Sequence, residues 1–434
     1  MGYVQETVET LKLKQETPHI QQSRPRRLSD LPFHKNILLL QGPVGSFFYH
    51  FAKHLNARGS IVNKVNFNGG DDYFFPKGKF NVIQYRFKLD YWPSFASKLL
   101  VNLNIDAVFL FGDCRPIHKP IISICKALNI DVWVFEEGYY RPHFFTLEHF
   151  GVNHFSPMAN IDLRQIDVRL ANDKDITLSN TINQNAFWHM AWAAIQYWLF
   201  SLLNKTHYPD YDHHRALDWR LGKAWIKSFF RYWIYQVSEY KKKKAIFQNA
   251  SKKMPHQYFL LALQLHDDAQ IHTHSDFNDL EQMLEMVITS FATRALESSN
   301  EYLIIKHHPM GRGSSNYKKY IYYLTTTLGI ADRVIYIHDI RLPSILPLIK
   351  GFVTVNSTLG LQALYHHIPV ITLGRSFFNK HGVTFQGSLE EFWKSPGAVD
   401  TKNVALLGKY IICNSQVEGS LYIPPPLFEQ YSHN

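Results

Sequence analysis

The stretch from Ala107 to Pro142 constrains the fold of this chain more than any other segment. Two apolar runs, at residues 107–111 and 132–135, flank an amphipathic run at 119–128. This pattern predicts a βαβ unit, in which a helix joins two parallel strands. A polar turn follows each strand, and the carboxyl ends of neighbouring parallel strands meet at one edge of a sheet. One crevice is therefore expected to collect the polar side chains of both turns: Asp113, Arg115, His118, Glu136, Glu137, Tyr139 and Arg141.

The length of 434 residues favours two domains, because one hydrophobic core seldom grows beyond about 300 residues. Hydrophobic residues make up 46% of the chain and charged residues 19%, a balance typical of folded proteins. The net charge of +10 favours an anionic partner: nucleic acid, anionic lipid or an acidic sugar nucleotide. We expect no nucleic-acid binding, because the sequence has no RNP, helix-turn-helix or zinc-finger pattern.

The three cysteines, Cys114, Cys125 and Cys413, lack the CxxC spacing of a zinc site. They fit a reducing cytoplasm, and we expect neither a disulfide framework nor a bound metal. The N-terminal residues lack the apolar run of a signal peptide. No apolar run reaches the roughly 18 residues that a membrane-spanning helix needs, so any membrane contact is expected to be peripheral.

The order of these patterns predicts four regions. Residues 1–33 are polar and end in an arginine cluster, which predicts a flexible N-terminal arm. Residues 34–180 and 253–434 alternate strand-like and helix-like runs, which predicts two Rossmann-like α/β domains. Residues 181–252, between them, are helical, aromatic and basic. The sequence therefore predicts an α/β fold of GT-B architecture, in which two doubly wound domains face each other across a cleft, with a helical insertion between them.

The helical region carries many aromatic residues ahead of a lysine run at 241–244. Aromatic side chains beside clustered lysine suit a helix that lies in a lipid headgroup region. Aromatic residues at helical spacing also suit a helical pair that packs against the first domain. The sequence leaves both interpretations open.

Two glycine-rich turns, at residues 41–46 and 68–72, each follow an apolar run. Glycines at such a turn let backbone amides approach an anion at the start of a helix. The first turn matches neither GxGxxG nor the P-loop, so a purely structural tight turn is the alternative. A plain surface turn is the alternative for the second. We take Gly45 and Asp71 as candidate sugar or acceptor contacts.

The adjacent carboxylates Glu136 and Glu137 are the sharpest catalytic candidates. Adjacent carboxylates after a buried strand repel and desolvate each other, so the pKa of one should rise unless Arg115 or Arg141 neutralises them. The resulting difference between the two pKa values supplies one ionised carboxylate, as nucleophile or base, and one protonated carboxyl group that can carry a proton. Neighbouring residues of an extended chain point in opposite directions, so only one of the two need face the substrate.

Three further residues extend this candidate site. Asp113 can act as a base or hold a sugar hydroxyl. Arg115 offers two parallel hydrogen bonds to a carboxylate or phosphate. His118 lies near the start of the following helix, where a simple cap is the alternative.

The second α/β pattern contains its own polar clusters at strand ends. An ammonium or imidazole group in the run 306–309 can stabilise a leaving phosphate in place of a metal ion. Adjacent histidines cannot easily chelate one ion, so a metal is the weaker alternative there. The run 356–360 predicts a helix start with free amides, which also suits phosphate. The candidate nucleotide contacts are Lys306, His307, His308, Pro309, Asn356, Ser357, Thr358, Gly360 and Gln264.

A series of motifs runs in order from about residue 36 to 393: LLLQGPVGSFF, VNFNGGDDYFF, FGDCRPIHKP, VFEEGYYRPHFFTLEHFGVNHFS, YPDYDHHR, HHPMGRG, VNSTLGLQALYHHIPVITLGR and GVTFQGSLEEFW. Together they resemble the bacterial capsule polysaccharide proteins of the KpsS type. The resemblance implies a GT-B glycosyltransferase that uses CMP-Kdo to build a short β-Kdo linker on a phosphatidylglycerol lipid. Other than this donor substrate it implies no cofactor.

The resemblance also implies partners and a location. The partners would be CMP-Kdo, a (lyso)phosphatidylglycerol acceptor, the cytoplasmic membrane surface, and other capsule biosynthesis or export proteins. The chain would lie in the cytoplasm, peripheral on the inner face of the inner membrane of a Gram-negative bacterium.

Related retaining Kdo transferases carry Glu-Asp-Gly after the equivalent strand, which matches residues 136–138 here and implies Glu137 as the nucleophile. Glutamate thus replaces aspartate at that position. The family's His-Pro pair matches residues 308–309 and would contact the CMP phosphate, with Ser357 and Thr358 assisting. Glu136 or Asp113 would act as base for the acceptor hydroxyl, while Arg115 or Arg141 would hold the sugar carboxylate.

Two other functional classes stay open. A catalytically silent sugar- or lipid-binding component of a capsule export complex would keep the fold without needing the full set of acids. A sugar-nucleotide epimerase of GT-B fold would act without any lipid acceptor.

Overall fold

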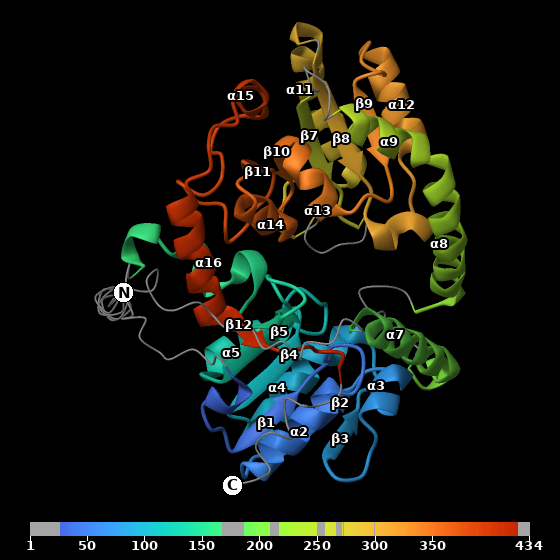
Figure 1. Ribbon diagram of the computed structural model, residues 1–434. Helices are drawn as coiled ribbons and strands as arrows, with labels where there is room; N and C mark the ends of the chain where they lie inside the picture. The colour runs from blue at the N-terminus through green and yellow to red at the C-terminus, as the bar shows by residue number, and fades with distance from the viewer. Residues whose placement is uncertain are drawn as a thin grey trace, which may run out of the picture.

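A computed structural model describes residues 27–166, 186–208, 217–249, 257–265, 271, 273–298 and 300–423. Two α/β domains face each other, with helices α7 to α9 along one side and α16 along the other (Figure 1). Residues 1–26 of the predicted arm lie outside the described residues, as do the predicted boundaries near 180 and 252.

The first domain contains a seven-stranded sheet in the order β12-β6-β5-β4-β1-β2-β3. Strands β1 to β5 are parallel, whereas β6 pairs antiparallel with β5, and β12 antiparallel with β6. The strands are β1 (Asn36–Leu39), β2 (Ile61–Asn66), β3 (Asn81–Gln84), β4 (Ala107–Phe111), β5 (Asp131–Glu137), β6 (Phe144–His149) and β12 (Gln416–Glu418). The helices are α2 (Phe47–Ala57), α3 (Gly69–Phe74), α4 (Trp92–Asn102) and α5 (Lys119–Leu128).

The central strands read as unbroken apolar runs because helices cover both faces of the sheet. Leu38 and Val108 point into one core with residues of α4 and α5. Leu39 and Phe109 point into the opposite core with Phe47 of α2. The predicted βαβ unit is therefore confirmed, with β4 and α5 at the expected residues.

The second domain contains a five-stranded parallel sheet in the order β11-β10-β7-β8-β9. Its strands are β7 (Gln257–Ala262), β8 (Glu301–Lys306), β9 (Val334–Ile337), β10 (Ile349–Thr354) and β11 (Val370–Thr372). Its helices include α11 (Leu280–Glu297), the 3-10 helix η7 (Pro309–Gly313), α12 (Lys318–Thr327), α13 (Leu342–Ile345), α14 (Leu359–Tyr365) and α15 (Leu389–Lys394). Apolar clusters lie on both faces of this sheet too. The predicted α/β GT-B architecture of two Rossmann-like domains is confirmed.

Helices α7 (Ala186–Leu203), α8 (Trp219–Ser238) and α9 (Tyr240–Asn249) form the predicted helical insertion. Helix α7 packs against α3 of the first domain, and α8 packs against η7 of the second. The insertion therefore contacts both domains along one side of the molecule (Figure 1).

The two ends of the described chain correct the predicted domain boundaries. Leu28 and Leu31, assigned to the flexible arm, are buried in a core of the first domain because apolar side chains there gain more from burial than from exposure. Helix α16 (Thr401–Ser415) leaves the second domain, and β12 then joins the first sheet beside β6. The second domain therefore does not extend to residue 434 as predicted.

Candidate active site

A cavity of about 1710 Å³ lies between the two domains. From the first domain it is lined by candidates on the β4–α5 turn and at the end of β5. From the second domain it is lined by candidates that follow β7, β8 and β10. The candidates in its lining are Asp113, Arg115, Glu136, Glu137, Arg141, Gln264, Lys306, His308, Pro309, Asn356, Ser357 and Thr358.

Glu136 and Glu137 occupy the last two positions of β5 rather than the turn predicted for them. Both line the cavity, whereas the alternation of an extended chain had left open that only one of them would face the substrate. Gly112 has a φ of 73° and no side chain, and a Cβ there would lie 3.6 Å from Glu136 Oε2. Gly138 allows the chain to turn into β6, since a Cβ at that position would overlap the carbonyl oxygen of Phe144. The Glu-Glu-Gly sequence thus places two carboxylates at the edge of one cavity.

The environment of Glu136 favours its protonated form. Burial raises the pKa of this carboxyl group to about 7, and the charges of Glu137 and Asp113 add to the effect. Two contacts oppose this rise in pKa. The Glu137 backbone N–H donates to Glu136 Oε1 at 2.9 Å, and the positive charge of Arg115 favours the ionised carboxylate. A carboxyl group with this pKa can exchange a proton near neutral pH.

Glu137 is contacted by a residue that sequence reasoning missed. The hydroxyl of Tyr422 donates a hydrogen bond to Glu137 Oε1, and Tyr422 follows the returning strand β12. Gln416 of β12 accepts a 2.8 Å hydrogen bond from the Tyr139 backbone N–H. The segment after α16 therefore holds the carboxylate-bearing strand end in place. No local pattern marks Tyr422, because it reaches Glu137 only through this return of the chain.

Asp113 is buried and already bonded to protein. Its Oδ2 accepts the Val152 backbone N–H at 2.8 Å, and its Oδ1 accepts the Cys114 thiol at 3.1 Å. Burial raises the pKa of both groups, which keeps Cys114 a neutral thiol. Cys114 Sγ also lies 3.4 Å from His274 Nε2 of the second domain. Because both carboxylate oxygens of Asp113 already bond to protein groups, these contacts favour a structural role in the cavity wall over proton transfer.

The two arginines of the acid side are held in different ways. Arg115 Nη1 donates to Gln41 Oε1 at 2.7 Å, and Gln41 Nε2 in turn donates to the Tyr197 hydroxyl of α7 at 2.8 Å. Arg141 Nε donates to the Gly138 carbonyl oxygen at 3.1 Å. Both guanidinium groups retain further N–H donors that can bind a carboxylate in the cavity.

The opposite wall of the cavity carries the second polar cluster. Lys306 ends β8, and its burial lowers its pKa, an effect that the Asp339 carboxylate partly offsets. His308 caps η7 by accepting the Met310 backbone N–H on its Nδ1 at 3.2 Å. Gln264 Nε2 donates to Asn356 Oδ1 at 2.8 Å, which joins the ends of β7 and β10. These ends of parallel strands form a polar edge that suits an anionic ligand.

Five candidates lie outside the cavity lining. Asp71 accepts hydrogen bonds from the Tyr197 hydroxyl at 3.0 Å and the Phe67 backbone N–H at 2.9 Å, because residues 69–74 form α3 rather than an open turn. Gly45 faces Ala193 of the same helix α7, which covers this edge of the sheet. Tertiary packing against α7 therefore occupies both glycine-rich turns.

The other three of these candidates also pack within protein. His118 is fully buried, and its Nδ1 lies 2.7 Å from the Gly112 carbonyl oxygen. His307 is buried, and its Nδ1 forms a 2.8 Å hydrogen bond with the Tyr336 hydroxyl. Gly360 packs against Phe378. The structure gives these residues structural roles in place of the predicted ligand contacts.

The cavity also contains basic residues that sequence reasoning did not select. Arg341 follows β9, where a polar turn was visible in the sequence. Lys409 lies on α16 and had no local signal, since helix periodicity alone does not say what a helix faces. Both line the cavity.

Comparison with known proteins identifies the family. The family model described as "Capsule polysaccharide biosynthesis protein" matches residues 106–422. The chain is 37% identical over 393 residues to the capsule polysaccharide modification protein LipB of Neisseria meningitidis serogroup B, covering 89% of this chain and 92% of that protein. It is 32% identical over 392 residues to the capsule polysaccharide export protein KpsS of Escherichia coli, covering 89% and 97%.

Solved structures show a more distant likeness. A structure described as Thermosulfurimonas dismutans KpsC, beta Kdo 2,7 transferase, matches with 12% identity and a TM-score of 0.36, over 86% of this chain and 89% of that one. At that score the likeness supports no conclusion about activity. The sequence matches, by contrast, span most of the chain and include the cavity residues of both domains, and the protein belongs to the family of capsule polysaccharide biosynthesis proteins.

Proposed function

We propose that the protein is a retaining β-Kdo glycosyltransferase that transfers Kdo from CMP-Kdo to a (lyso)phosphatidylglycerol lipid in capsule synthesis. One observation carries this proposal: the carboxyl groups of Glu136 and Glu137 line the same cavity as Lys306 and His308. Acids on one wall suit the reacting sugar, and bases on the other suit the departing phosphate. Membership of a capsule biosynthesis family supports a capsule glycan as the product.

The proposed reaction is a double displacement. In the first step a Glu137 oxygen bonds to the anomeric carbon of Kdo, and the bond from that carbon to the CMP phosphate oxygen breaks. CMP leaves with the electron pair, and its charge is stabilised by Lys306 and His308. Arg115 and Arg141 hold the carboxylate of the sugar. No metal or other cofactor takes part in this scheme.

In the second step the lipid hydroxyl attacks the same carbon and releases Glu137. Glu136 accepts the hydroxyl proton, a role that suits a carboxyl group whose pKa is raised to about 7. Two inversions at one carbon give net retention.

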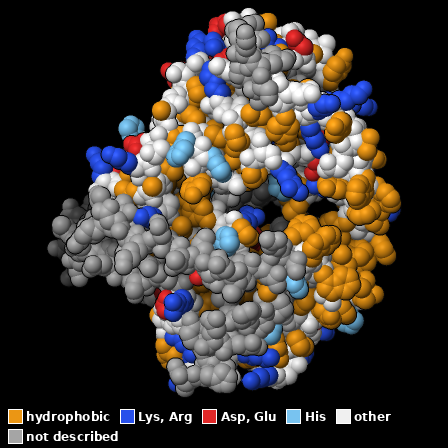
Figure 2. Space-filling view, in the orientation of Figure 1, with side chains coloured by type: hydrophobic (Ala, Val, Ile, Leu, Met, Phe, Trp, Pro, Cys, Tyr) orange, Lys and Arg blue, Asp and Glu red, His pale blue; other side chains and the backbone are white. Residues whose placement is uncertain are grey.

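The lipid acceptor is supported by the outer face of the helical insertion. Figure 2 shows a continuous group of hydrophobic side chains on the side of the molecule where α7 and α8 lie. Arg220, Lys223 and Lys227 of α8 are exposed beside them. Among the described residues no helix is long and apolar enough to cross a membrane. The exposed apolar residues of α7 and α8 include Phe187, Trp188, Trp192, Leu203, Trp219, Ile226, Phe229, Phe230, Trp233, Ile234 and Val237.

We propose that this face rests on the anionic surface of the inner membrane, on its cytoplasmic side. Aromatic rings there would enter the headgroup region while the basic side chains meet lipid phosphates. The alternative interpretation, a helical pair packed against the first domain, holds for α7 alone, because Tyr197 and Ser201 of α7 are buried there while α8 packs against the second domain.

Purified protein incubated with CMP-Kdo and a synthetic phosphatidylglycerol is expected to release CMP and form a lipid heavier by one Kdo residue. Mass spectrometry of the lipid fraction measures this product, with CMP-sialic acid as the control donor. Binding of CMP-Kdo without any product would indicate the silent binding component instead. Conversion of the sugar nucleotide in the absence of lipid would indicate an epimerase.

Vesicles containing phosphatidylglycerol are expected to carry the protein upward in a flotation gradient. The double variants Trp188→Ser/Trp192→Ser and Phe229→Ser/Phe230→Ser should each bind about tenfold or more weakly, since burial of one such side chain contributes roughly 1.5–3 kcal/mol. The matched control is Leu296→Ser/Tyr323→Ser, whose residues are 72% and 64% exposed on α11 and α12. Equal flotation of all three variants would contradict lipid contact through α7 and α8.

A further inference from the structure

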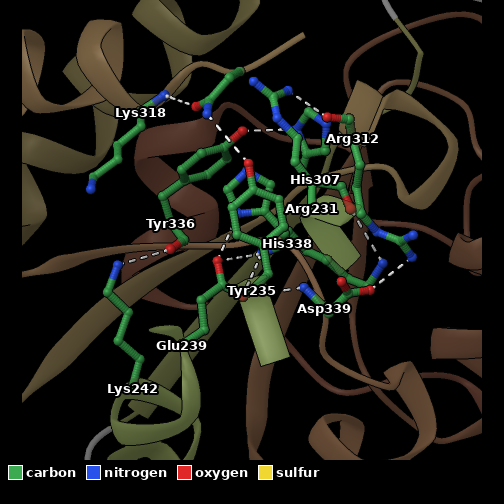
Figure 3. Close-up of polar contacts among 12 residues, drawn as sticks. Arg231, Tyr235, Glu239, Lys242, His307, Arg312, Lys318, Tyr336, His338 and Asp339 are labelled. Atoms are coloured by element: carbon green, nitrogen blue, oxygen red, sulfur yellow. Dashed lines mark hydrogen bonds and ion pairs between the residues drawn. The ribbon is translucent and has the colours of Figure 1, made fainter. Parts of the chain in front are cut away.

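The junction of α8 and α9 contacts two loops that form part of the cavity wall. Loop 306–313, here defined as the last residue of β8 and the chain through η7, brings Lys306, His308 and Pro309 to the cavity. Loop 338–343, the turn after β9 with the first residues of α13, brings Ile340 to Pro343. Three residues of the insertion contact these loops and are absent from the cavity lining: Arg231, Tyr235 and Glu239, here called the anchor residues. Figure 3 shows them beside His307, Arg312, His338 and Asp339.

Glu239 is the centre of these contacts. Its side chain is buried, and its Oε1 accepts the Nδ1–H of His338 at 2.6 Å. Both carboxylate oxygens also lie 3.1 Å from the His338 backbone nitrogen, which donates to them. Burial alone would raise the pKa of Glu239, but the hydrogen bonds from His338 outweigh it and the pKa lies below its ordinary value. The carboxylate therefore stays ionised and holds the start of loop 338–343.

Tyr235 and Arg231 extend the contact over both loops. The Tyr235 ring stacks on the His338 imidazole at 3.7 Å with an interplanar angle of 10°. Arg231 Nη1 donates to the Arg312 carbonyl oxygen at 2.6 Å. The Arg312 side chain in turn pairs with Asp339 at 2.9 Å, so loops 306–313 and 338–343 are joined to each other as well as to α8 (Figure 3).

The backbones of α8 and loop 306–313 also approach closely. A Cβ at Gly313 would lie 1.9 Å from the carbonyl oxygen of Ala224, which leaves room only for glycine. A shift of α8 along this contact would therefore have to move loop 306–313 with it.

The opposite face of the same helix carries the exposed aromatic residues. Helix α7, which completes this surface, belongs to the other side of the cavity, where Tyr197 bonds Gln41 and Asp71 of the first domain. Trp198 of α7 donates its indole N–H to the Asp218 carbonyl oxygen at 2.9 Å, at the start of α8. The hydrophobic surface of Figure 2 thus belongs to two helices, of which α7 packs against the first domain and α8 against the second.

We propose that the anchor residues position loops 306–313 and 338–343, so that contact of α8 with an anionic bilayer and binding of a nucleotide in the cavity strengthen each other. When α7 and α8 both lie on one flat bilayer, the bilayer restrains the relative position of the two domains. It thereby also restrains the width of the cavity between them. Such coupling is reciprocal: because a single coupling free energy links the two binding events, each ligand raises the affinity for the other by the same factor. This inference rests on the proposed function for its two ligands, and it adds a positioning role for Glu239.

The test measures CMP binding by titration calorimetry, with and without phosphatidylglycerol vesicles. Wild-type protein is expected to bind CMP about fivefold more tightly with vesicles present, and saturating CMP should raise vesicle affinity by the same factor. Glu239→Gln, which keeps the side-chain shape, should bind CMP and vesicles separately while the coupling factor falls toward one. Arg231→Met removes the hydrogen bond to the Arg312 carbonyl oxygen and the guanidinium charge but keeps the contacts of Glu239, so it should reduce the factor in part. Glu281→Gln, an exposed carboxylate on α11, is the matched control.

The outcomes separate the inference from the proposed function. Melting temperatures identify any variant that fails to fold. If Glu239→Gln fails to fold, Arg231→Met tests the positioning role in its place. Equal CMP affinity with and without vesicles in wild-type protein would overturn the coupling and leave CMP-Kdo transfer standing. Full coupling in both folded variants would overturn the positioning role of the anchor residues. Absence of CMP binding under every condition would overturn both the inference and the proposed donor.

Discussion

Glu137→Gln is expected to lower the rate of Kdo transfer by about 10³-fold or more while leaving CMP affinity within about twofold. The amide keeps the size of the side chain and can still accept the hydrogen bond from Tyr422, but it is not nucleophilic. The CMP contacts belong to the opposite wall of the cavity and are unchanged. Product mass and CMP titration on the same preparation measure the two effects.

Glu137→Asp is the matched control for this variant. It keeps a carboxylate and recreates the Glu-Asp-Gly sequence of the Kdo transferases that this stretch resembles. The shorter side chain moves the oxygen away from Tyr422, so measurable but reduced transfer is expected. Full turnover by Glu137→Gln would rule out Glu137 as the nucleophile.

The second large effect is a pH dependence centred on Glu136. Burial raises the pKa of this carboxyl group from 4.5 to about 7, so transfer that uses its ionised form should rise as the pH increases through 7. Glu136→Gln should remove this limb of the profile and lower the maximal rate by about 10²-fold.

The same shift predicts a change in stability. Because the folded-state pKa lies above the unfolded one, wild-type protein loses stability progressively as the pH rises from 4.5 to about 7. In that range the carboxyl group ionises in the unfolded chain while it stays protonated in the folded protein, and above pH 7 the loss is complete. The difference in unfolding free energy between Glu136→Gln and wild type should therefore depend on pH. It should favour the variant by about 1–3 kcal/mol more at pH 8.5 than at pH 5. Urea unfolding at both pH values measures the difference. A difference that does not change with pH would show that Glu136 titrates normally.

Local patterns predicted the parts of the fold that depend on local physics. The runs at β4 and α5 were recognisable because strands covered on both faces are continuously apolar, and because an amphipathic helix repeats every 3.6 residues. Once the strands were recognised, the carboxylates of β5 and the basic cluster at the end of β8 could be found too, because ligand sites gather at the carboxyl ends of parallel strands.

Long-range packing decided the rest of the candidate site. Asp71 has the chemistry of a ligand contact, yet Tyr197 of α7 bonds it from more than one hundred residues along the chain. Tyr422 has no motif around it, yet it contacts Glu137 because β12 pairs with β6. Neither pairing has a periodicity or spacing that a linear pattern could reveal.

The sequence by itself therefore determined two α/β domains, the strand ends that carry the acids and bases, and the aromatic, basic character of the insertion. These follow from burial and periodicity, which act over a few neighbouring residues. Only the tertiary structure decided that Glu136 and Glu137 share one cavity with Lys306, that α7 closes the glycine-rich turns, and that α8 holds loops 306–313 and 338–343. Each of these depends on which distant surfaces meet, because the free energy of such contacts belongs to pairs of segments rather than to either one alone.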